Sequence, residues 1–440
     1  MATLILYWFR NDLRLSDNPA FVRACRDADY LCPIVIHNPA HSGVTTWGFE
    51  RIGRHRRQFQ QESIDDLRSH LQRMGSDLYE FEGKPSEIVL NLRNTLGNLD
   101  VYCQHIEAPE ECKDIKDIRA LGVQVKTFWQ SSMLDPMQLP FDLKAMPDVF
   151  TLFRKSVESI NLKYAQPLDV PKAVPSLPKN ISALANGISV VPLSHPVILG
   201  GGESRAQLHI QQYLDRRLPD TYKQTRNGLM GKDFSSKLSP WLALGCCSAR
   251  WFVQQLDAYE QRHGANDGTY WLWFELLWRD YFQFLPFKYG HRLFIKQGLS
   301  DKPVPPFDPQ RFHAWQTGQT PEALINAGMR ELSGSGYISN RMRQIVASYW
   351  VYDMAGDWRA GAAWFEANLM DYDVYSNQGN WLYIAGRGTD PRGGRSFNIA
   401  KQTLAHDPDG AYRTCWLEFD NTIHHQESQF SDSLQKGIWQ

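Results

Sequence analysis

The chain has 440 residues, and 47 Lys and Arg against 48 Asp and Glu leave a formal net charge of −1. This balance excludes a uniformly basic nucleic-acid-binding protein, although it is compatible with a local basic groove. Hydrophobic residues (42%) and charged residues (22%) occur at the levels of a globular protein, and no apolar run approaches the roughly 20 residues of a membrane span.

Seven cysteines are scattered along the chain without a C-x-x-C pair. We therefore expect neither a disulfide framework nor a metal site. The segment Met1–Leu6 lacks the basic start of a secretory signal. The sequence thus predicts a cytoplasmic protein with no membrane partner.

The first 130 residues alternate strand and helix signals. The expected strands are Leu4–Phe9, Leu31–His37, Asp77–Phe81, Val101–His105 and Val123–Trp129. The expected helices are Pro19–Ala28, which Asp17 and Asn18 cap, Phe49–Met74, Pro85–Leu96 and Pro109–Leu121. This order predicts an α/β domain with a doubly wound, Rossmann-like parallel sheet.

Beyond residue 130 the character of the sequence changes twice. Recurrent prolines over 131–200 predict an irregular linker with one short helix near Val149–Ile160. From 201 to 420, helix signals dominate and predict an all-α domain, followed by a polar tail over 421–440. The helices expected there are Glu203–Leu218, Ser248–His263, Tyr270–Phe284, Pro321–Ala327, Asn340–Ala355 and Gly361–Met370.

Aromatic residues are abundant, with 15 Trp, 22 Phe and 18 Tyr. They indicate either a large aromatic core or a protein that stacks rings or transfers electrons between them. In Tyr270–Phe284 the rings recur at helical spacing and form one face. This segment is either a core helix, with Glu275 and Arg279 paired on the surface, or the wall of a cavity with Glu275 as a buried anchor.

Three polar segments are candidates for binding. The hydroxyls of 235–239 precede an expected helix and indicate either an anion site or ordinary N-capping. Asp371, Asp373 and Asn377 suit a cation, a ribose or heterocycle, or only a polar turn. Basic residues at 339–344 and at Arg387, Arg392 and Arg395 alternate with Tyr337, Trp381 and Tyr383, which indicates a single-stranded nucleic-acid surface or a solvated basic face.

Longer segments resemble a known family. The opening YWFRNDLRLSDNPAF, followed in order by SSKLSPWLALG, FELLWRDYF, GYISNRMRQIVAS, DWRAGAAWFE and DYDVYSNQGNW, resembles the photolyase/cryptochrome family. MPDVFTLFRKSVE, WRDYFQF and GTDPRGGRSFNIAKQ resemble its cryptochrome-DASH branch. The resemblance covers about Ile5 to Gln402 and implies a C-terminal helical domain that holds FAD in a folded, U-shaped form.

The resemblance also implies positions for the cofactor residues. Its phosphates and ribityl chain would contact Tyr222, Ser235, Ser236, Lys237, Leu238 and Ser239. Glu275 and Arg279 would line the site from the aromatic helix. Arg343 and Asp371 would pair beside the isoalloxazine ring, Asp373 would reach its edge and Asn377 would face the flavin N5.

The chemistry of this family is light-driven electron transfer from reduced flavin to a pyrimidine dimer, and it needs no general acid or nucleophile. The resemblance implies that Glu275 hydrogen-bonds the flipped-out dimer, that Trp278 stacks on it, and that Arg226, Asn340 and Arg341 hold its backbone and edge. Gln344 and Tyr383 stand where duplex photolyases carry Met and Trp. These two changes predict weaker dimer binding in duplex, by ~1 kcal/mol for Tyr383.

Two family features are altered here. Trp381 and Trp358 match the two inner tryptophans of a photoreduction chain, but the outer position holds Pro305. Either Trp315 or a tyrosine substitutes for it, or photoreduction is slow. The acid that serves the antenna cofactor methenyltetrahydrofolate falls at Ile106, with Glu107 one place later, which predicts at most weak folate binding.

The sequence therefore predicts an enzyme, a photolyase that repairs ultraviolet-damaged DNA, preferably single-stranded or looped, and acts as a monomer. The alternative is a blue-light photoreceptor that signals through flavin redox change. The absence of a long tail disfavours that alternative. A third reading is a flavin or nucleic-acid binding module that holds RNA or DNA independently of light.

Overall fold

Five strands form one parallel sheet in the order β3-β2-β1-β4-β5 in the computed structural model, which describes residues 2–181 and 199–418. β1 lies at the centre, where Leu4 pairs with Tyr30 of β2 and Ile5 with Asp100 of β4. All six residues of β1 are buried, which agrees with its uninterrupted apolar sequence. The strands are β1 (Leu4–Phe9), β2 (Tyr30–His37), β3 (Tyr79–Glu82), β4 (Asp100–Gln104) and β5 (Gln124–Phe128).

Two pairs of helices cover the two faces of this sheet, as the doubly wound prediction requires. Side chains of α1 and α2 share a core with Ile5, Tyr7 and Phe9. Side chains of α3 and α4 share the other core with Leu4, Leu6 and Trp8, the alternate residues of the same strand. The helices are α1 (Pro19–Asp27), α2 (Arg54–Arg73), α3 (Pro85–Leu96) and α4 (Pro109–Ala120).

Helix α2 begins five residues later than predicted. The chain before it forms an antiparallel bridge between Val44 and Glu50, and Gly53 occupies the N-cap position. The apolar Phe49 and Ile52 that suggested an earlier start therefore lie in the preceding loop. Phe49 packs against Trp364 of the helical domain, which a search for helical spacing cannot detect.

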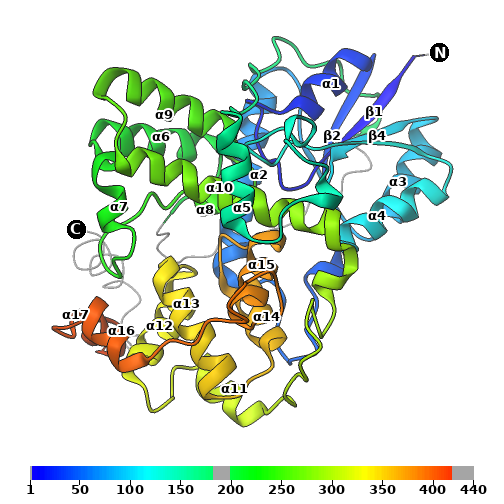
Figure 1. Ribbon diagram of the computed structural model, residues 1–440. Helices are drawn as coiled ribbons and strands as arrows, with labels where there is room; N and C mark the ends of the chain where they lie inside the picture. Colours follow the sequence, from blue (N-terminus) through cyan, green and yellow to red (C-terminus); the bar gives the residue numbers. More distant parts are fainter. Residues whose placement is uncertain (1, 182–198, 419–440) are drawn as a thin grey trace.

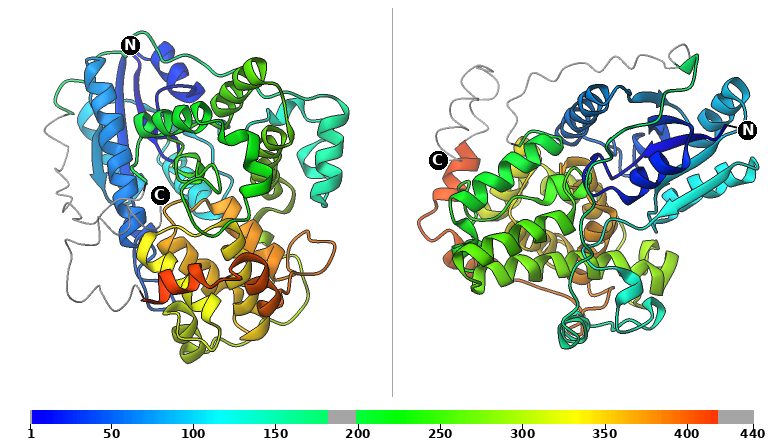
Figure 2. Two further views of the ribbon diagram at one scale, coloured as in Figure 1. Left: turned by 90° about the vertical axis from the view of Figure 1, so that its left-hand side faces the viewer. Right: turned by 90° about the horizontal axis from the view of Figure 1, so that it is seen from above.

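Beyond β5 the described chain is largely irregular up to residue 149 and over 160–181, and it is mostly helical from residue 203 onward (Figures 1 and 2). The helix expected after the hydroxyls of 235–239 is the short one at 239–243. The short helices at 222–225 and 309–316, and those at 374–384, 399–406 and 411–418, were not predicted. The helices are α5 (Phe150–Ser159), α6 (Glu203–Asp215), α7 (Tyr222–Thr225), α8 (Ser239–Ala243), α9 (Ala249–His263), α10 (Asp267–Tyr289), α11 (Pro309–Gln316), α12 (Ala323–Ser335), α13 (Asn340–Ser348), α14 (Trp358–Asn368), α15 (Val374–Ile384), α16 (Ile399–His406) and α17 (Ala411–Glu418). None of the described helices is long and apolar enough to cross a membrane.

Helix α10 is longer than the aromatic segment that predicted it. A capping box between Asn266 and Thr269 starts it, and it continues past Phe284 through Pro286 to Tyr289. The predicted tail over 421–440, and the part of the predicted linker at 182–198, lie outside the described residues.

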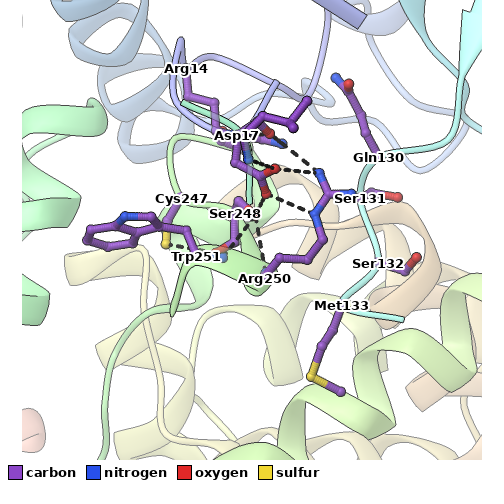
Figure 3. Close-up of polar contacts among 12 residues, drawn as sticks. Arg14, Asp17, Gln130, Ser131, Ser132, Met133, Cys247, Ser248, Arg250 and Trp251 are labelled. Carbon is purple, nitrogen blue, oxygen red and sulfur yellow. Dashed lines mark hydrogen bonds and ion pairs between the residues drawn. The ribbon is translucent and has the colours of Figure 1, made fainter. Parts of the chain in front are cut away.

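A buried ion pair joins the sheet domain to the helical domain (Figure 3). Arg250 of α9 donates from Nε and Nη2 to the two carboxylate oxygens of Asp17, at 2.9 and 3.0 Å, and Ser248 Oγ also bonds that carboxylate. Asp17 is fully buried. Arg14 reaches across the same boundary to the Gly245 carbonyl oxygen at 2.8 Å. These contacts hold the two domains in one orientation and so position the walls of the site described below.

Candidate functional site

A cavity of about 580 Å³ lies within the helical domain, a volume typical of ligand sites. Its walls come from α7, the segment before α8, α10, α13, and the loop and helix around α15. A second cavity of about 200 Å³ adjoins it, and Arg343, Asp371 and Asp373 line both. Most of the predicted site residues line the larger cavity: Tyr222, Arg226, Ser235, Ser236, Lys237, Leu238, Ser239, Glu275, Trp278, Arg279, Asn340, Arg341, Arg343, Gln344, Asp371, Asp373 and Tyr383.

Helix α10 forms the aromatic wall. Trp278 stacks on Phe150 of α5 with ring centroids 3.6 Å apart, so one face of the indole is covered and its orientation is restrained. Glu275 bonds Arg226 in an ion pair. Burial raises the pKa of the Glu275 carboxyl, and the Arg226 charge opposes this effect.

The predicted surface pair between Glu275 and Arg279 does not form. Arg279 instead donates to the Ser131 and Leu242 carbonyl oxygens at 2.6 and 3.1 Å. Although the two residues are four apart on the helix, the Glu275 carboxylate pairs with Arg226, and the Arg279 guanidinium bonds backbone carbonyl oxygens of other segments. The alternative interpretation, in which this helix forms a cavity wall, agrees with the structure.

The hydroxyl segment forms a second wall. Helix α8 behind it spans only five residues, so its backbone dipole is small and the predicted anion site depends on side chains. Lys237 is 3% exposed and donates to the Gly231 carbonyl oxygen at 2.8 Å. Burial lowers the pKa of its amine to about 6. An anionic ligand beside this amine would stabilise its charged form.

Lys237 also has a left-handed backbone, with φ at 51°. Such a conformation costs energy in a residue with a side chain, and strained residues of this kind concentrate at ligand sites. The backbone at Lys237 is thus held in a left-handed conformation that a residue with a side chain rarely adopts.

The third wall carries the predicted ion pair of α13 with the segment before α15. Arg343 donates to both carboxylate oxygens of Asp371, at 3.0 and 2.8 Å. The Asp371 side chain is 1% exposed, so its charge depends on this partner. Asp373 accepts a hydrogen bond from the Ser376 backbone at 2.7 Å and thereby starts α15.

A polar turn was one of the alternatives for 371–377; the segment is instead the start of α15, which brings further residues to the site. Ser376 and Asn380, one turn apart, line both cavities and were not predicted. Tyr337 and Arg395 also line the larger cavity. The helical spacing of Ser376 and Asn380 is the signal that a search for binding residues could have used.

Three predicted residues lie outside the larger cavity. Asn377 and Trp381 line the smaller one, where Asn377 donates to the Ala362 carbonyl oxygen at 3.0 Å. Among the residues that the structure describes, the buried indole nitrogen of Trp381 has no hydrogen-bond partner. Trp358 lines neither of these two cavities, and its indole N–H donates to the Lys296 carbonyl oxygen at 3.1 Å.

The residues predicted to hold DNA gather at one side of the larger cavity. Arg341 donates to Gln344 at 3.1 Å and to Asn227 at 3.0 Å. Tyr383 contacts Trp278 edge to face at 5.7 Å between ring centroids, and its hydroxyl accepts a bond from Arg395 at 2.6 Å. Cationic and aromatic side chains thus share the walls with the hydroxyl and acidic groups.

A further cavity of about 1110 Å³ lies at the carboxyl ends of the sheet strands, and Arg10, His37 and Ile106 are among its walls. Glu107 is not one of them; its carboxylate bonds His105 at 2.7 Å. That Glu107 could serve a bound folate in place of Ile106 stays a prediction. In the described part of the chain, no three His, Cys, Asp or Glu side chains gather as a metal site, and all seven cysteines are free thiols.

The geometry suits a ligand that is anionic at one end and flat at the other. Lys237 and the hydroxyls of Ser235, Ser236 and Ser239 line the larger cavity. The Arg343–Asp371 pair lines both cavities, and the indole of Trp381 lines the smaller one. The backbone of Gly361 permits this position of the indole, because a Cβ there would lie 2.2 Å from Trp381 Cη2.

Comparisons with known proteins agree on what the chain resembles. Residues 5–175 match the family described as DNA photolyase, and residues 271–435 match the FAD binding domain of DNA photolyase. Cryptochrome DASH proteins of Xenopus laevis and Gloeobacter violaceus are both 42% identical to the chain over 94% of its length, covering 82% and 85% of those proteins. A crystal structure of a Synechocystis sp. PCC6803 cryptochrome superposes with a TM-score of 0.88 and 35% identity, covering 99% of this chain and 92% of that one.

Proposed function

Because the chain belongs to the photolyase/cryptochrome family, in its cryptochrome DASH branch, and carries that family's FAD-binding domain, we propose that it repairs cyclobutane pyrimidine dimers in single-stranded or looped DNA. The reaction would be that of a photolyase, driven by blue light.

The chain's own residues suit FAD. We assign the pyrophosphate and ribityl part to Ser235, Ser236, Lys237 and Ser239, with Tyr222 and Leu238 beside them, because their wall combines hydroxyls with a buried amine. We assign the ring system to the side where Arg343, Asp371, Asp373 and Asn377 lie. Glu275 and Arg279 complete the wall from α10.

Bound FAD, once reduced and excited by blue light, would supply an electron to the dimer, which splits and returns it. The protein's tasks are then to exclude water, to hold the dimer and to orient it. Trp278 offers a ring whose position Phe150 restrains, so a base can stack on it without further ordering of the side chain. Glu275, with its raised pKa, can share a hydrogen bond with the dimer in place of part of its pairing with Arg226.

One observation carries the proposal: the residues assigned to the cofactor, apart from Asn377, and those assigned to the damaged bases line the same cavity. Arg226, Asn340 and Arg341 lie there together with Glu275 and Trp278. Electron transfer to the dimer needs this proximity. A cavity that admits the cofactor alone would leave Arg341 and Gln344 without a role at its wall.

The preference for single strands follows from the cost of extruding the dimer. Flipping a base pair out of a duplex costs a few kcal/mol of unstacking, and less in a single strand. Gln344 and Tyr383 place polar groups in the cavity wall, and these groups already bond Arg341 and Arg395. The cavity therefore has less aromatic surface than one with Met and Trp at these positions, and stacking of the extruded bases offsets less of that cost. The net charge of −1 also provides little general attraction to a long duplex.

The test is repair of a defined dimer by the purified, FAD-loaded protein under blue light, in a single-stranded oligonucleotide and in the matching duplex. We expect light-dependent loss of the dimer in the single strand, with a lower yield in the duplex. Absence of repair in both, by protein whose FAD is reduced, would refute the proposal. A light-dependent change in binding of a protein partner without repair would then indicate the photoreceptor, and light-independent retention of RNA or DNA a binding module.

A further inference from the structure

Partly exposed aromatic rings near the start of α10 form a row that leads out of the larger cavity. Phe274 lines the cavity and stacks on Trp271, with ring centroids 4.8 Å apart and an angle of 27° between the ring planes. Tyr270 follows at 6.1 Å from Trp271 and is 38% exposed. Exposed aromatic surface beside a ligand cavity is typical of a binding site rather than of a core.

This aromatic row is continuous with the part of the wall assigned to the damaged bases. Phe150 of α5 stacks on Trp278 and also meets Phe274 edge to face, with ring centroids 5.3 Å apart. Arg226 lines the cavity, and its guanidinium carbon lies 5.7 Å from the centre of the Trp271 ring. The rings and Arg226 thus connect the place assigned to the dimer with Trp271 beyond the cavity wall.

The length of the row matches a short stretch of nucleotides. Trp271 and Trp278 are two turns apart on α10, which is about 10 Å along the helix. Because this spacing is close to two whole turns, both residues lie on one side of the helix. Nucleotides stacked about 3.4 Å apart cover the same distance in roughly three steps. A strand whose dimer lies against Trp278 can therefore place its next bases at Phe274 and Trp271.

Cationic side chains approach the rings from α5 and α7, two helices that contact α10 (Figure 1). The Lys223 amine of α7 lies 5.1 Å from the centre of the Trp271 ring. The Arg154 guanidinium of α5 lies 5.8 Å from the centre of the Phe274 ring. Each cation beside the rings is also paired with an acid; the partners of Lys223, Arg154 and Arg226 are Asp267, Glu158 and Glu275, respectively.

These three ion pairs carry no net charge, because each cation meets one carboxylate. A phosphate group gains a full ion pair here only by displacing a carboxylate, so the backbone of a nucleic acid contributes little net binding at the row. Base stacking on aromatic side chains needs no excess charge, and it accepts any base because every base has a π-face. The row therefore suits the bases of an unpaired strand better than its phosphates.

We propose that Phe274 and Trp271, with Tyr270 at the far end, form a stacking platform for the unpaired bases that follow the dimer on one side of a single strand. This inference rests on the proposed function, because it places the dimer at Trp278. In a duplex the same bases are paired and stacked within the double helix, and they reach the platform only if they too are extruded. The platform thus stabilises the complex with a single strand and not the complex with a duplex.

The test measures how FAD-loaded protein binds, in the dark, single-stranded oligonucleotides that carry one thymine dimer. We expect about three nucleotides added on one side of the dimer to raise the affinity about fivefold or more. Abasic sites in place of those nucleotides should remove the gain, although the phosphates remain. An equal gain with and without the bases would overturn the proposal, because the contact would then be made by the backbone. This comparison uses the unaltered protein, so it does not depend on the folding of any variant.

Trp271→Leu tests the ring itself, because it keeps an apolar side chain but removes the flat surface. This variant should lose the gain that the added bases provide, about fivefold or more, and should bind the dimer dinucleotide within about twofold of the unaltered protein. The dependence of its affinity on salt concentration should be unchanged, since no phosphate contact is lost. Trp251→Leu is the matched control, because Trp251 of α9 is also partly exposed and lines neither cavity. An equal loss in both variants would overturn the proposal.

Binding in the dark separates this inference from the proposed function. If Trp271→Leu loses the gain from the added bases but the unaltered protein repairs no dimer under blue light, the platform stands and the repair function fails. If the unaltered protein repairs dimers and Trp271→Leu keeps the whole gain, the repair function stands and the platform fails. A change in self-association in Trp271→Leu, measured by sedimentation, with unchanged oligonucleotide binding would also overturn the proposal, because the rings would then form an interface between copies of the chain.

Discussion

Breaking the Arg343–Asp371 pair from either side should have unequal effects. The Asp371 side chain is 1% exposed, whereas that of Arg343 is 23% exposed at the cavity. Arg343→Met leaves a buried carboxylate without its partner, which should cost about 3–5 kcal/mol of unfolding free energy. Asp371→Asn leaves a guanidinium that water in the cavity can reach. That change should cost only about 1–3 kcal/mol, the value of lost hydrogen bonds to a charged group.

The double variant Arg343→Met with Asp371→Asn tests the reasoning. Because it removes both charges, it should be about 2 kcal/mol more stable than the sum of the two losses predicts. We would measure unfolding by guanidinium on FAD-free protein, because bound FAD adds its own binding free energy. FAD content per chain should fall in both single variants. Equal losses in the two single variants, or additive losses in the double one, would refute the assignment of a desolvated pair.

Three further outcomes follow from the site. Glu275→Gln should retain FAD but weaken dimer binding by about tenfold or more, because a hydrogen bond that a charged carboxylate accepts is lost; a repair assay at limiting substrate measures this. Tyr383→Trp should raise repair of dimers in duplex relative to single strands, because about 1 kcal/mol of stacking is regained. In FAD-free protein the Lys237 amine should contribute up to about 1.4 kcal/mol of stability per pH unit as the pH rises from about 6 towards 10, since the unfolded amine is protonated in that range while the folded one, with its pKa of about 6, is not. The buried Glu331 carboxyl, whose pKa is raised to about 8, acts in the opposite direction below that pH.

Each of these has a control. Unchanged repair by Glu275→Gln would remove its role with the dimer, and lost FAD would move that role to the cofactor. For Tyr383→Trp, the ratio of duplex to single-strand yield is the measure, so a general loss of activity does not imitate the effect. The Lys237 slope is read as the difference from Lys237→Met, which has no amine to titrate. A slope that persists with FAD bound would contradict the placement of an anion beside Lys237.

The local sequence determined much of the sheet domain. Leu4–Phe9 and Pro85–Leu96 have the predicted bounds because a buried apolar run and a Pro-to-Gly helix frame are local signals. The parallel, doubly wound order followed from the alternation of strands and helices. Most of the residues named in advance for the site do line the cavities, although they were named through resemblance to a family rather than through spacing, and Ser376 and Asn380 were missed.

Only the tertiary structure decided which of these residues meet. Glu275 and Arg279 have a spacing that suits a pair, yet Arg226 lies closer to the carboxylate and backbone carbonyl oxygens to the guanidinium. Helix α15 was not predicted, because the helical spacing of its polar residues becomes informative only when one face of the helix is known to adjoin a cavity. The contacts of Trp381 with Trp315 join segments 66 residues apart. Such contacts depend on how helices pack, and a helix's own sequence carries no information about which ring of another helix its side chain will touch.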